Sequence, residues 1–379
     1  MMENRPRRNS RIELLRIVSM LMIVAHHYAV YGFYAEELAF SRNKIFVDLF
    51  GMGVRIGVDL FVLISGYYLV RARFRLKKLL MLMGSVWFYM LLSLLLVAVT
   101  GLYPLDRTIL RGVCFPLLTS QYWFASYYAL LLLFSPFLNA LIRNLSRGLH
   151  AALCLLLFTL CTLLPELLHV SFAGGMLPLF AALYLCGGYA RLYLPAGERI
   201  ARRALLLALG LWLLCALRVG IGDRLAQRAG DFQRLESSLA FLDVYSPLAF
   251  AIAFLLLLAA CTRRPADWRF LSRVGGLCFG VYLFHANPVV NSVVWQRVFR
   301  TAAFVDSPWL PLHAVGTTAA LFAAGCLVEL LRLRTAAPLW ERGVDALSPR
   351  LEALLRRAGQ AGLRLADRVL GTERGEEET

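Results

Sequence analysis

Charged residues are scarce in this sequence. Asp, Glu, Lys and Arg make up 17% of its 379 residues, whereas hydrophobic residues make up 59%. This balance excludes an ordinary soluble domain, in which about a quarter of the residues carry charge. Repeated apolar runs of membrane length instead indicate a polytopic membrane protein, because a helix needs about 20 apolar residues to cross the hydrocarbon core.

Acidic residues are scarcer than basic ones, 24 against 40, which gives a net charge of +16. Such an excess can indicate nucleic-acid binding, but outside the apolar runs the basic residues are not interleaved with aromatic ones. The basic residues cluster instead in segments that alternate with nearly neutral ones along the chain. This is the pattern of the positive-inside rule. The excess therefore predicts a topology with both termini in the cytoplasm and gives no indication of a nucleic-acid partner.

The apolar runs and this alternation together predict an all-α polytopic membrane protein with ten transmembrane helices. The domain that holds them covers 1–335. The predicted spans are 12–34, 48–70, 79–100, 121–143, 149–169, 172–193, 203–221, 239–260, 273–297 and 308–332.

Several familiar motifs are absent from the sequence. None of the eight cysteines forms a Cys-x-x-Cys pair and nearly all lie in apolar runs, so neither a disulfide framework nor a zinc site is expected. No phosphate-binding loop, dinucleotide fingerprint, metal-ligand spacing or Gly-x-Ser-x-Gly elbow occurs, which argues against a classical serine hydrolase. No internal repeat is evident, which disfavours transporter folds built from repeated halves.

The tail, 336–379, differs from the membrane domain. Trp340, Val344, Leu347 and Leu351 recur at helical spacing among arginines. This pattern predicts an amphipathic basic helix on the anionic cytoplasmic leaflet. The alternative is a solvated helix that the protein can lose without losing function.

The first span carries ionisable residues at a spacing that suggests chemistry. Arg16 and His27 are eleven positions apart, about three helical turns, and therefore share one face. Ionisable groups inside a bilayer are costly and mark functional sites. An imidazole at mid-depth can serve as a general base or as an acyl-accepting nucleophile. The alternative is that His27 only hydrogen-bonds another helix, while His26 points about 100° away and packs or supports.

The second span offers two further features. Arg55 and Asp59 are four residues apart and can neutralise each other, or Asp59 can orient an imidazole. The small pair Ser65 and Gly66 near its cytoplasmic end precedes a basic cluster. That combination suits a phosphorylated cytosolic donor such as coenzyme A, although basic clusters also anchor topology. The cluster consists of Arg71, Arg73, Arg75, Lys77 and Lys78.

Two later spans contribute candidate acceptor residues. The fourth opens with Tyr122 and Trp123, which are typical of the interface belt and can also stack on a sugar ring. The ninth places His285 at a depth similar to that of His27, so the two histidines can line one chamber. Packing is the alternative for His285.

Four blocks of the sequence, which include the residues described above, resemble those of the acyltransferase family 3 membrane proteins. These proteins O-acylate glycans and other acceptors at bacterial surfaces. The resemblance covers almost the whole membrane domain. It implies an acyl-CoA donor, usually acetyl-CoA, essential roles for His27 and Arg16, and handling of the donor by the basic loop. In that loop Lys78 stands where the family's Arg-x-x-Arg has its second arginine. The blocks are Arg16 with His27, 58–67 (VDLFVLISGY), 122–124 (YWF) leading to 135–139 (SPFLN), and 279–288 (FGVYLFHANP).

The resulting hypothesis is an O-acyltransferase of the bacterial cytoplasmic membrane that moves an acetyl group to a hydroxyl of a cell-surface glycan or lipid-linked saccharide. Acetyl-CoA docks at 71–78 and its pantetheine arm passes between the first two spans to His27, the base or acyl carrier. Asp59 or Arg16 sets the protonation and orientation of that imidazole, and no metal is required. The residues expected on the donor side are Ser65, Gly66, Arg71, Arg73, Arg75 and Lys78, and those on the acceptor side are His285, Tyr282, Trp123, Asn287 and His26.

Two rival classes remain open at this point. A non-enzymatic carrier or flippase for a glycan-lipid predicts alternating access without thioester consumption. A catalytically dead subunit of an export complex predicts the same fold without donor binding, and the intact Arg16 and His27 pair argues against it. The acceptor, the length of the acyl group and the oligomeric state are not determined by the sequence.

Overall fold

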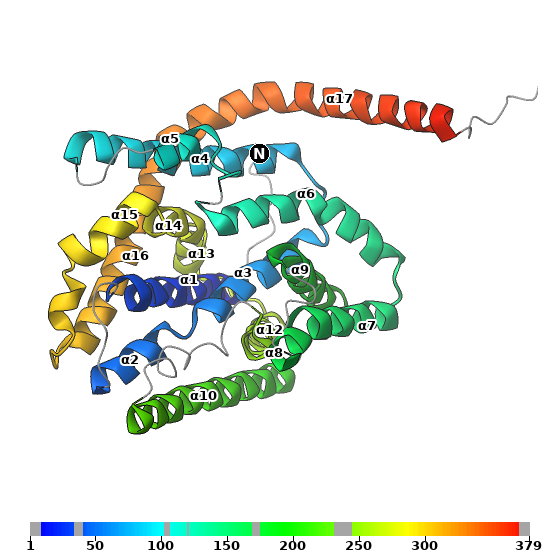
Figure 1. The fold of residues 1–379 in the computed structure, drawn as a ribbon. Coiled ribbons are helices and arrows are strands. Elements are labelled where there is room, and N and C mark those ends of the chain that lie inside the picture. Colours follow the sequence, from blue (N-terminus) through cyan, green and yellow to red (C-terminus); the bar gives the residue numbers. More distant parts are fainter. Residues whose placement is uncertain are drawn as a thin grey trace, which may run out of the picture.

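The computed structural model describes residues 9–33, 41–101, 107–119, 121–168, 175–230 and 245–370. All regular secondary structure in these ranges is helical, which confirms the all-α prediction (Figure 1). The ends of four predicted spans, at 34, 169, 172–174 and 239–244, lie outside the described residues, as do 1–8 and 371–379.

Six helical stretches among the described residues are long and apolar enough to cross a membrane, and a bent pair gives up to seven. The polytopic prediction is therefore confirmed, while the count of ten and the orientation of the termini stay predictions. The six are α1 (Ser10–Tyr31), α4 (Leu76–Thr100), α6 (Trp123–Asn144), Arg147–Leu168, α10 (Glu198–Ala229) and α16 (Leu310–Arg334), and the bent pair is Arg269–His285 with Pro288–Val298.

Two of these stretches consist of several helices, and the helices outside them are shorter or less apolar. Arg147–Leu168 consists of α7 (Arg147–Phe158), η1 (Thr159–Leu163) and α8 (Leu164–Leu168), and the bent pair of α13 (Arg269–Gly275), α14 (Cys278–His285), α15 (Pro288–Val293) and η3 (Val294–Val298). The others are α2 (Arg42–Gly51), α3 (Val54–Leu69), α5 (Arg107–Cys114), α9 (Met176–Tyr193), α12 (Pro247–Cys261), η4 (Thr301–Phe304) and α17 (Ala336–Leu370).

Two apolar runs that the sequence suggests are continuous are broken in the structure. The run 48–70 is divided between α2 and α3, and Gly53 at the break packs against Met22 of α1. The run 273–297 bends by 67°. Pro288 cannot continue the helix hydrogen bonding of α14, and it starts α15, which the side chain of Asn287 caps.

Helices α1 and α3 lie at the centre of the bundle (Figure 1). Glycines allow their close packing, since a Cβ at Gly57 would stand 2.7 Å from the carbonyl oxygen of Ser19 on α1. On the opposite side of α3, Gly66 and Gly187 bring the backbones of α3 and α9 into contact. Small residues at such crossings are typical of helix association in membranes, where packing rather than water exclusion holds the helices together.

The C-terminal helix α17 packs on α4 over its first turns and then continues beyond the bundle (Figure 1). The indole N–H of Trp340 donates to the carbonyl of Leu80 at 3.0 Å, and Lys77 Nζ pairs with Glu341 and Asp345 at 2.7 Å each. Because the contacts move back along α4 as α17 advances, the two helices are antiparallel. Residues 353–361 are exposed all round.

Candidate functional site

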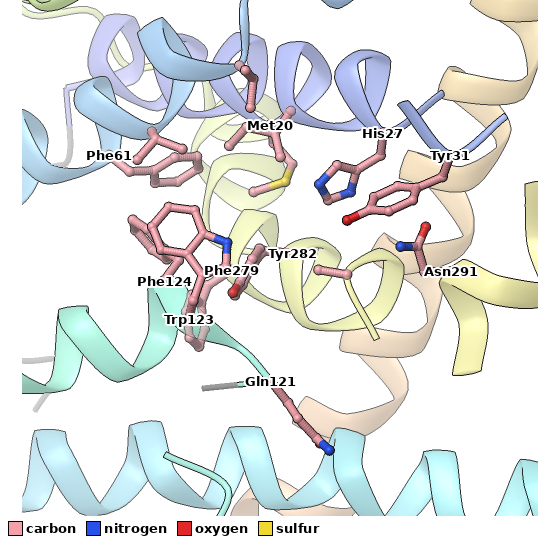
Figure 2. Close-up of a pocket in the computed structure, with 14 residues that line it drawn as sticks. Met20, His27, Tyr31, Phe61, Gln121, Trp123, Phe124, Phe279, Tyr282 and Asn291 are labelled. Carbon is pink, nitrogen blue, oxygen red and sulfur yellow. The ribbon is translucent and has the colours of Figure 1, made fainter. Parts of the chain in front are cut away.

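A chamber of about 110 Å³ lies between α1, α3, α6 and α14. Figure 2 shows Met20, Phe61, Trp123 and Phe124 gathered to one side of the His27 ring, with Tyr31 and Asn291 on its other side. The chamber therefore has an apolar end and a polar end, and His27 lies where they meet. The full lining is Met20, Ile23, His27, Tyr31, Val54, Val58, Phe61, Gln121, Trp123, Phe124, Phe279, Tyr282, Ala286 and Asn291.

The ring of His27 is held among other rings. Its centroid lies 5.2 Å from that of Tyr31, one turn along α1, and 4.9 Å from that of His285 on α14. Its Nδ1 is buried and has no hydrogen-bond partner. His285 is not among the residues that line the chamber, so the prediction that the two histidines share one chamber stays a prediction, although their rings are in contact.

His285 is fully buried, and one of its ring nitrogens already makes a hydrogen bond. Its Nδ1 lies 2.7 Å from the carbonyl oxygen of Val281. Because a carbonyl can only accept, Nδ1 carries the hydrogen, and in the neutral ring Nε2 is left with a lone pair. That Nε2 is buried without a hydrogen-bond partner. Two buried nitrogens that lack partners therefore belong to two rings in contact.

His26 faces away from the chamber. Its Nδ1 lies 3.1 Å from the carbonyl oxygen of Gly51, the last residue of α2. Since the carbonyl accepts, His26 donates, and the contact ties α1 to α2. This placement agrees with the reading that His26 packs or supports.

Of the other residues expected on the acceptor side, Trp123 and Tyr282 line the chamber and Asn287 does not. The Asn287 amide donates to the carbonyl of Tyr89 at 3.1 Å and lies 2.8 Å from the hydroxyl oxygen of Tyr122. Its Oδ1 accepts from the first N–H groups of α15. Asn287 therefore joins α14 and α15 to α4.

Sequence reasoning missed three polar residues of the chamber, Tyr31, Gln121 and Asn291. The signal for Tyr31 was present, because it follows His27 by four residues and so lies on the same helix face. Asn291 accepts a hydrogen bond from the Trp295 indole at 2.7 Å through Oδ1, which turns its amide N–H₂ toward the chamber in Figure 2. The bend before α15 determines this position, and the apolar pattern does not reveal it.

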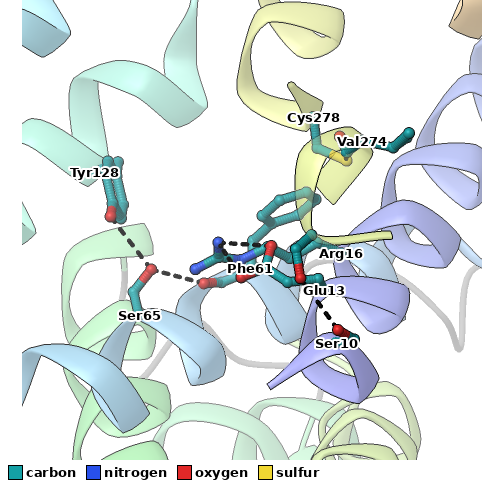
Figure 3. A network of polar contacts seen from close by, with 9 residues as sticks. Ser10, Glu13, Arg16, Phe61, Ser65, Tyr128, Val274 and Cys278 are labelled. Atoms are coloured by element: carbon teal, nitrogen blue, oxygen red, sulfur yellow. Dashed lines mark hydrogen bonds and ion pairs between the residues drawn. The ribbon is translucent and has the colours of Figure 1, made fainter. Parts of the chain in front are cut away.

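Arg16 lies away from His27. Eleven residues of helix correspond to about 16 Å along the axis, so the two side chains do not touch. The Arg16 guanidinium pairs with Glu13 at 3.2 Å and lies 5.6 Å above the ring of Tyr68. Figure 3 shows this pair beside a second contact, in which Ser65 reaches both the carbonyl of Phe61 and the hydroxyl of Tyr128.

Asp59 is buried on α3, and the charge of Arg55, one turn earlier on the same helix, interacts electrostatically with its carboxyl group. The guanidinium of Arg55 also lies 5.8 Å from the ring centroid of Trp123. The neutralising pair and the orienting role of Asp59 both stay predictions. Arg55 places a cation on one face of an aromatic ring that lines the chamber.

The basic loop before α4 forms a small recess. Arg73, Arg75 and Lys78 line it, together with Leu132 and Ser135 of α6, whereas Arg71 does not. Ser65 and Gly66 do not line it either: Gly66 lies against α9, and Ser65 lies one turn deeper.

Successive turns of α3 and α6, with side chains in contact, lie between the recess and the chamber. Phe61 and Phe124 face each other at the chamber, with ring centroids 6.2 Å apart. One turn nearer the loop, the hydroxyl oxygens of Ser65 and Tyr128 lie within hydrogen-bond distance, 3.3 Å apart. One turn further, Leu69 packs on Leu132 and both line the recess. Those two residues complete a column that runs from the basic loop to His27.

A buried ion pair near the chamber was also missed. Arg332 donates to both oxygens of Glu329, at 2.7 and 2.8 Å, and the Tyr89 hydroxyl donates to the same carboxylate at 2.9 Å. Gly280 of α14 lies directly against this carboxylate. The sequence signal was an acid and a base three residues apart at the end of an apolar run.

No group of three or more His, Cys, Asp or Glu side chains within the described ranges is arranged to hold a metal ion. The fold and the chamber define a multi-pass membrane protein with a buried imidazole at an internal cavity. The family model of the acyltransferase 3 type, described as an acyltransferase domain, matches residues 9–329, and the chain belongs to this family of membrane acyltransferases. Comparisons with curated proteins and with solved structures gave no match.

Proposed function

We propose that this protein is an O-acyltransferase that moves an acetyl group from cytosolic acetyl-CoA to a hydroxyl of a cell-surface glycan or lipid-linked saccharide in the bacterial cytoplasmic membrane. The observation that carries the proposal is the position of His27 between the apolar and polar ends of one chamber. A thioester arm and a hydroxyl acceptor can therefore approach the same imidazole from different ends.

The donor binds at the recess of the basic loop. Arg73, Arg75 and Lys78 present three cations around a small concavity, which suits the phosphates of coenzyme A. The pantetheine arm then follows the column between α3 and α6. A route between α1 and α3, expected from the sequence, is not favoured, because Gly57 brings these helices into backbone contact. Arg16 flanks the column near Tyr68, and its role belongs to the donor side.

The acceptor enters from the polar end. The hydroxyl of Tyr31 and the amide of Asn291 are groups that hydrogen-bond sugar hydroxyls, whereas the ring of Trp123 lies at the apolar end, on the other side of His27. The acceptor hydroxyl then meets the thioester beside His27.

His27 acts as the general base in this proposal. Its imidazole takes the proton of the acceptor hydroxyl while the oxygen attacks the thioester carbonyl. The carbon–sulfur bond breaks, coenzyme A leaves as a thiolate, and the imidazolium returns the proton to the sulfur. The products are an acetyl ester and free coenzyme A. Direct transfer is favoured over an acyl-histidine because both substrates reach the ring from opposite ends of the chamber.

The test uses purified protein with radiolabelled acetyl-CoA and a lipid-linked saccharide extract. We expect label in the saccharide fraction as an alkali-labile ester, and release of one coenzyme A per ester. Transport of a glycan-lipid without any thioester consumption would overturn the proposal in favour of a carrier. Label retained on His27 under quench conditions would replace the base by an acyl-histidine.

A further inference from the structure

We propose that His285 is a positioning residue that accepts the Nδ1–H of His27 and thereby directs the Nε2 lone pair of His27 to the chemistry. This inference rests on the proposed function, because it assigns a partner to the imidazole that performs the transfer. It also moves His285 from the acceptor side, where the sequence placed it, to the support of His27.

The hydrogen-bond inventory of the two rings leads to this assignment. Nδ1 of His285 donates to the Val281 carbonyl, so its buried Nε2 can only accept. Nδ1 of His27 is buried and also lacks a partner. An unpaired buried polar group costs about 1–3 kcal/mol. One hydrogen bond from His27 to His285 satisfies both nitrogens, and the rings already lie 4.9 Å apart, centroid to centroid.

The consequence concerns the tautomer of His27. If Nδ1 holds the hydrogen, Nε2 carries the lone pair, as in a catalytic histidine whose Nδ1–H is held by an acceptor. A carboxylate usually provides that acceptor. Here a neutral imidazole does so, which avoids a buried charge beside an apolar chamber inside the membrane.

The position of His285 depends on how α14 is held. This helix has eight residues and is followed by the 67° bend, so it has no long helical continuation to hold it. Two contacts fix it instead. Gly280 lies against the carboxylate of Glu329, which Arg332 and Tyr89 hold in place. At the other end, Asn287 binds the Tyr89 carbonyl of α4.

These contacts act as a clamp on both ends of α14, defined by Gly280 with Glu329 and by Asn287 with Tyr89. A carboxylate with three hydrogen bonds from a bidentate arginine and a tyrosine is fixed in orientation. A displacement of α14 by about 1 Å would move Nε2 of His285 away from His27, and misplacements of that size cost about 100-fold in rate.

The first experiment compares His285→Ala with His285→Gln in the full-length protein. Truncation to alanine removes the acceptor, and we expect kcat for acetyl-CoA turnover to fall about 10- to 100-fold while the donor KM stays unchanged. Glutamine supplies an amide oxygen and should recover part of the loss. Nitrogen resonances of labelled histidines, assigned by their absence in His27→Gln, should show hydrogen on Nδ1 of His27 in the wild type and not in His285→Ala.

The second experiment tests the clamp with a single methyl group. Gly280→Ala pushes against the Glu329 carboxylate, whereas Gly316→Ala on α16 has open space and serves as the matched control. We expect a fall of about 10-fold or more in kcat for Gly280→Ala only, with partial recovery when Glu329→Asp retracts the carboxylate by one methylene.

The outcomes separate this inference from the proposed function. If His27→Gln keeps normal turnover, the proposed function fails. If His27→Gln is inactive but His285→Ala turns over at the wild-type rate, or the wild-type His27 carries its hydrogen on Nε2, only the role of His285 fails. Where His285→Ala does not fold, His285→Gln and the wild-type tautomer still decide the matter.

Discussion

The rings of His27 and His285 lie 4.9 Å apart although they belong to the first helix and to α14, near the other end of the membrane domain. Each ring carries a buried nitrogen without a partner. Close packing of two imidazoles at the junction of an apolar and a polar cavity end is costly for folding alone, and a reaction that needs a base at that point accounts for it.

Replacement of His27 by glutamine should remove turnover while the protein still inserts. The change keeps a polar side chain of similar reach but removes the base, and general-base catalysis contributes about 100- to 10,000-fold. The measurement is coenzyme A release from acetyl-CoA by purified protein in the presence of a lipid-linked saccharide extract. His150→Gln is the matched control, since His150 is a buried histidine that bonds the Leu185 carbonyl between α7 and α9, away from the chamber. Comparable losses in both variants would contradict the assignment.

Much of this architecture follows from the sequence because membrane spans obey a simple rule. A run of about 20 apolar residues must be helical, since no other conformation satisfies the backbone in lipid. The spacing of Arg16 and His27 on one helix face, and that of Arg55 and Asp59 one turn apart on α3, follow from helical periodicity in the same way.

What the sequence did not reveal depends on contacts between helices. The pairing of Glu329 with Gly280 joins α16 to α14, and the column of α3 and α6 joins residues from two separate spans. Hydropathy reports depth in the membrane but not which helices are neighbours. The sequence therefore singled out His285 without indicating that its ring would meet His27.

The basic recess should control the affinity for the donor and not the rate of transfer. Changing Arg75 and Lys78 together to alanine removes two of its three lining cations. Because exposed charge-assisted contacts to phosphate are screened but additive, we expect the KM for acetyl-CoA to rise about 10-fold, with kcat nearly unchanged. Initial rates at several ionic strengths provide the measurement, and higher salt should weaken the wild type more than the variant. Arg147→Ala, an exposed cation at the start of α7, is the control. A loss confined to kcat would show that the recess does not bind the donor.

Removal of the Tyr128 hydroxyl should ease passage of the donor arm. The hydrogen bond between the Ser65 and Tyr128 hydroxyls at 3.3 Å closes the column between recess and chamber, and a single such bond is worth about 0.5–1.5 kcal/mol. Tyr128→Phe keeps the ring and should therefore raise kcat/KM for acetyl-CoA by about 2- to 10-fold, a range that corresponds to that energy. Tyr127→Phe, the neighbouring position, is the control. An unchanged kcat/KM in Tyr128→Phe would place the donor route elsewhere.

The contact of α17 with α4 should contribute to the stability of the membrane domain. Trp340 packs against Gly84 and Trp87 and donates to the Leu80 carbonyl. Its truncation to alanine removes a large, half-buried ring, and we expect a loss of about 2–4 kcal/mol in the free energy of unfolding. Thermal unfolding in one detergent, followed by intrinsic fluorescence and by aggregation, measures the shift in Tm. Leu354→Ala is the control, because this leucine is 58% exposed on the projecting part of the same helix. Equal Tm values for Trp340→Ala and the wild type would mean that α17 associates with the bundle without stabilising it.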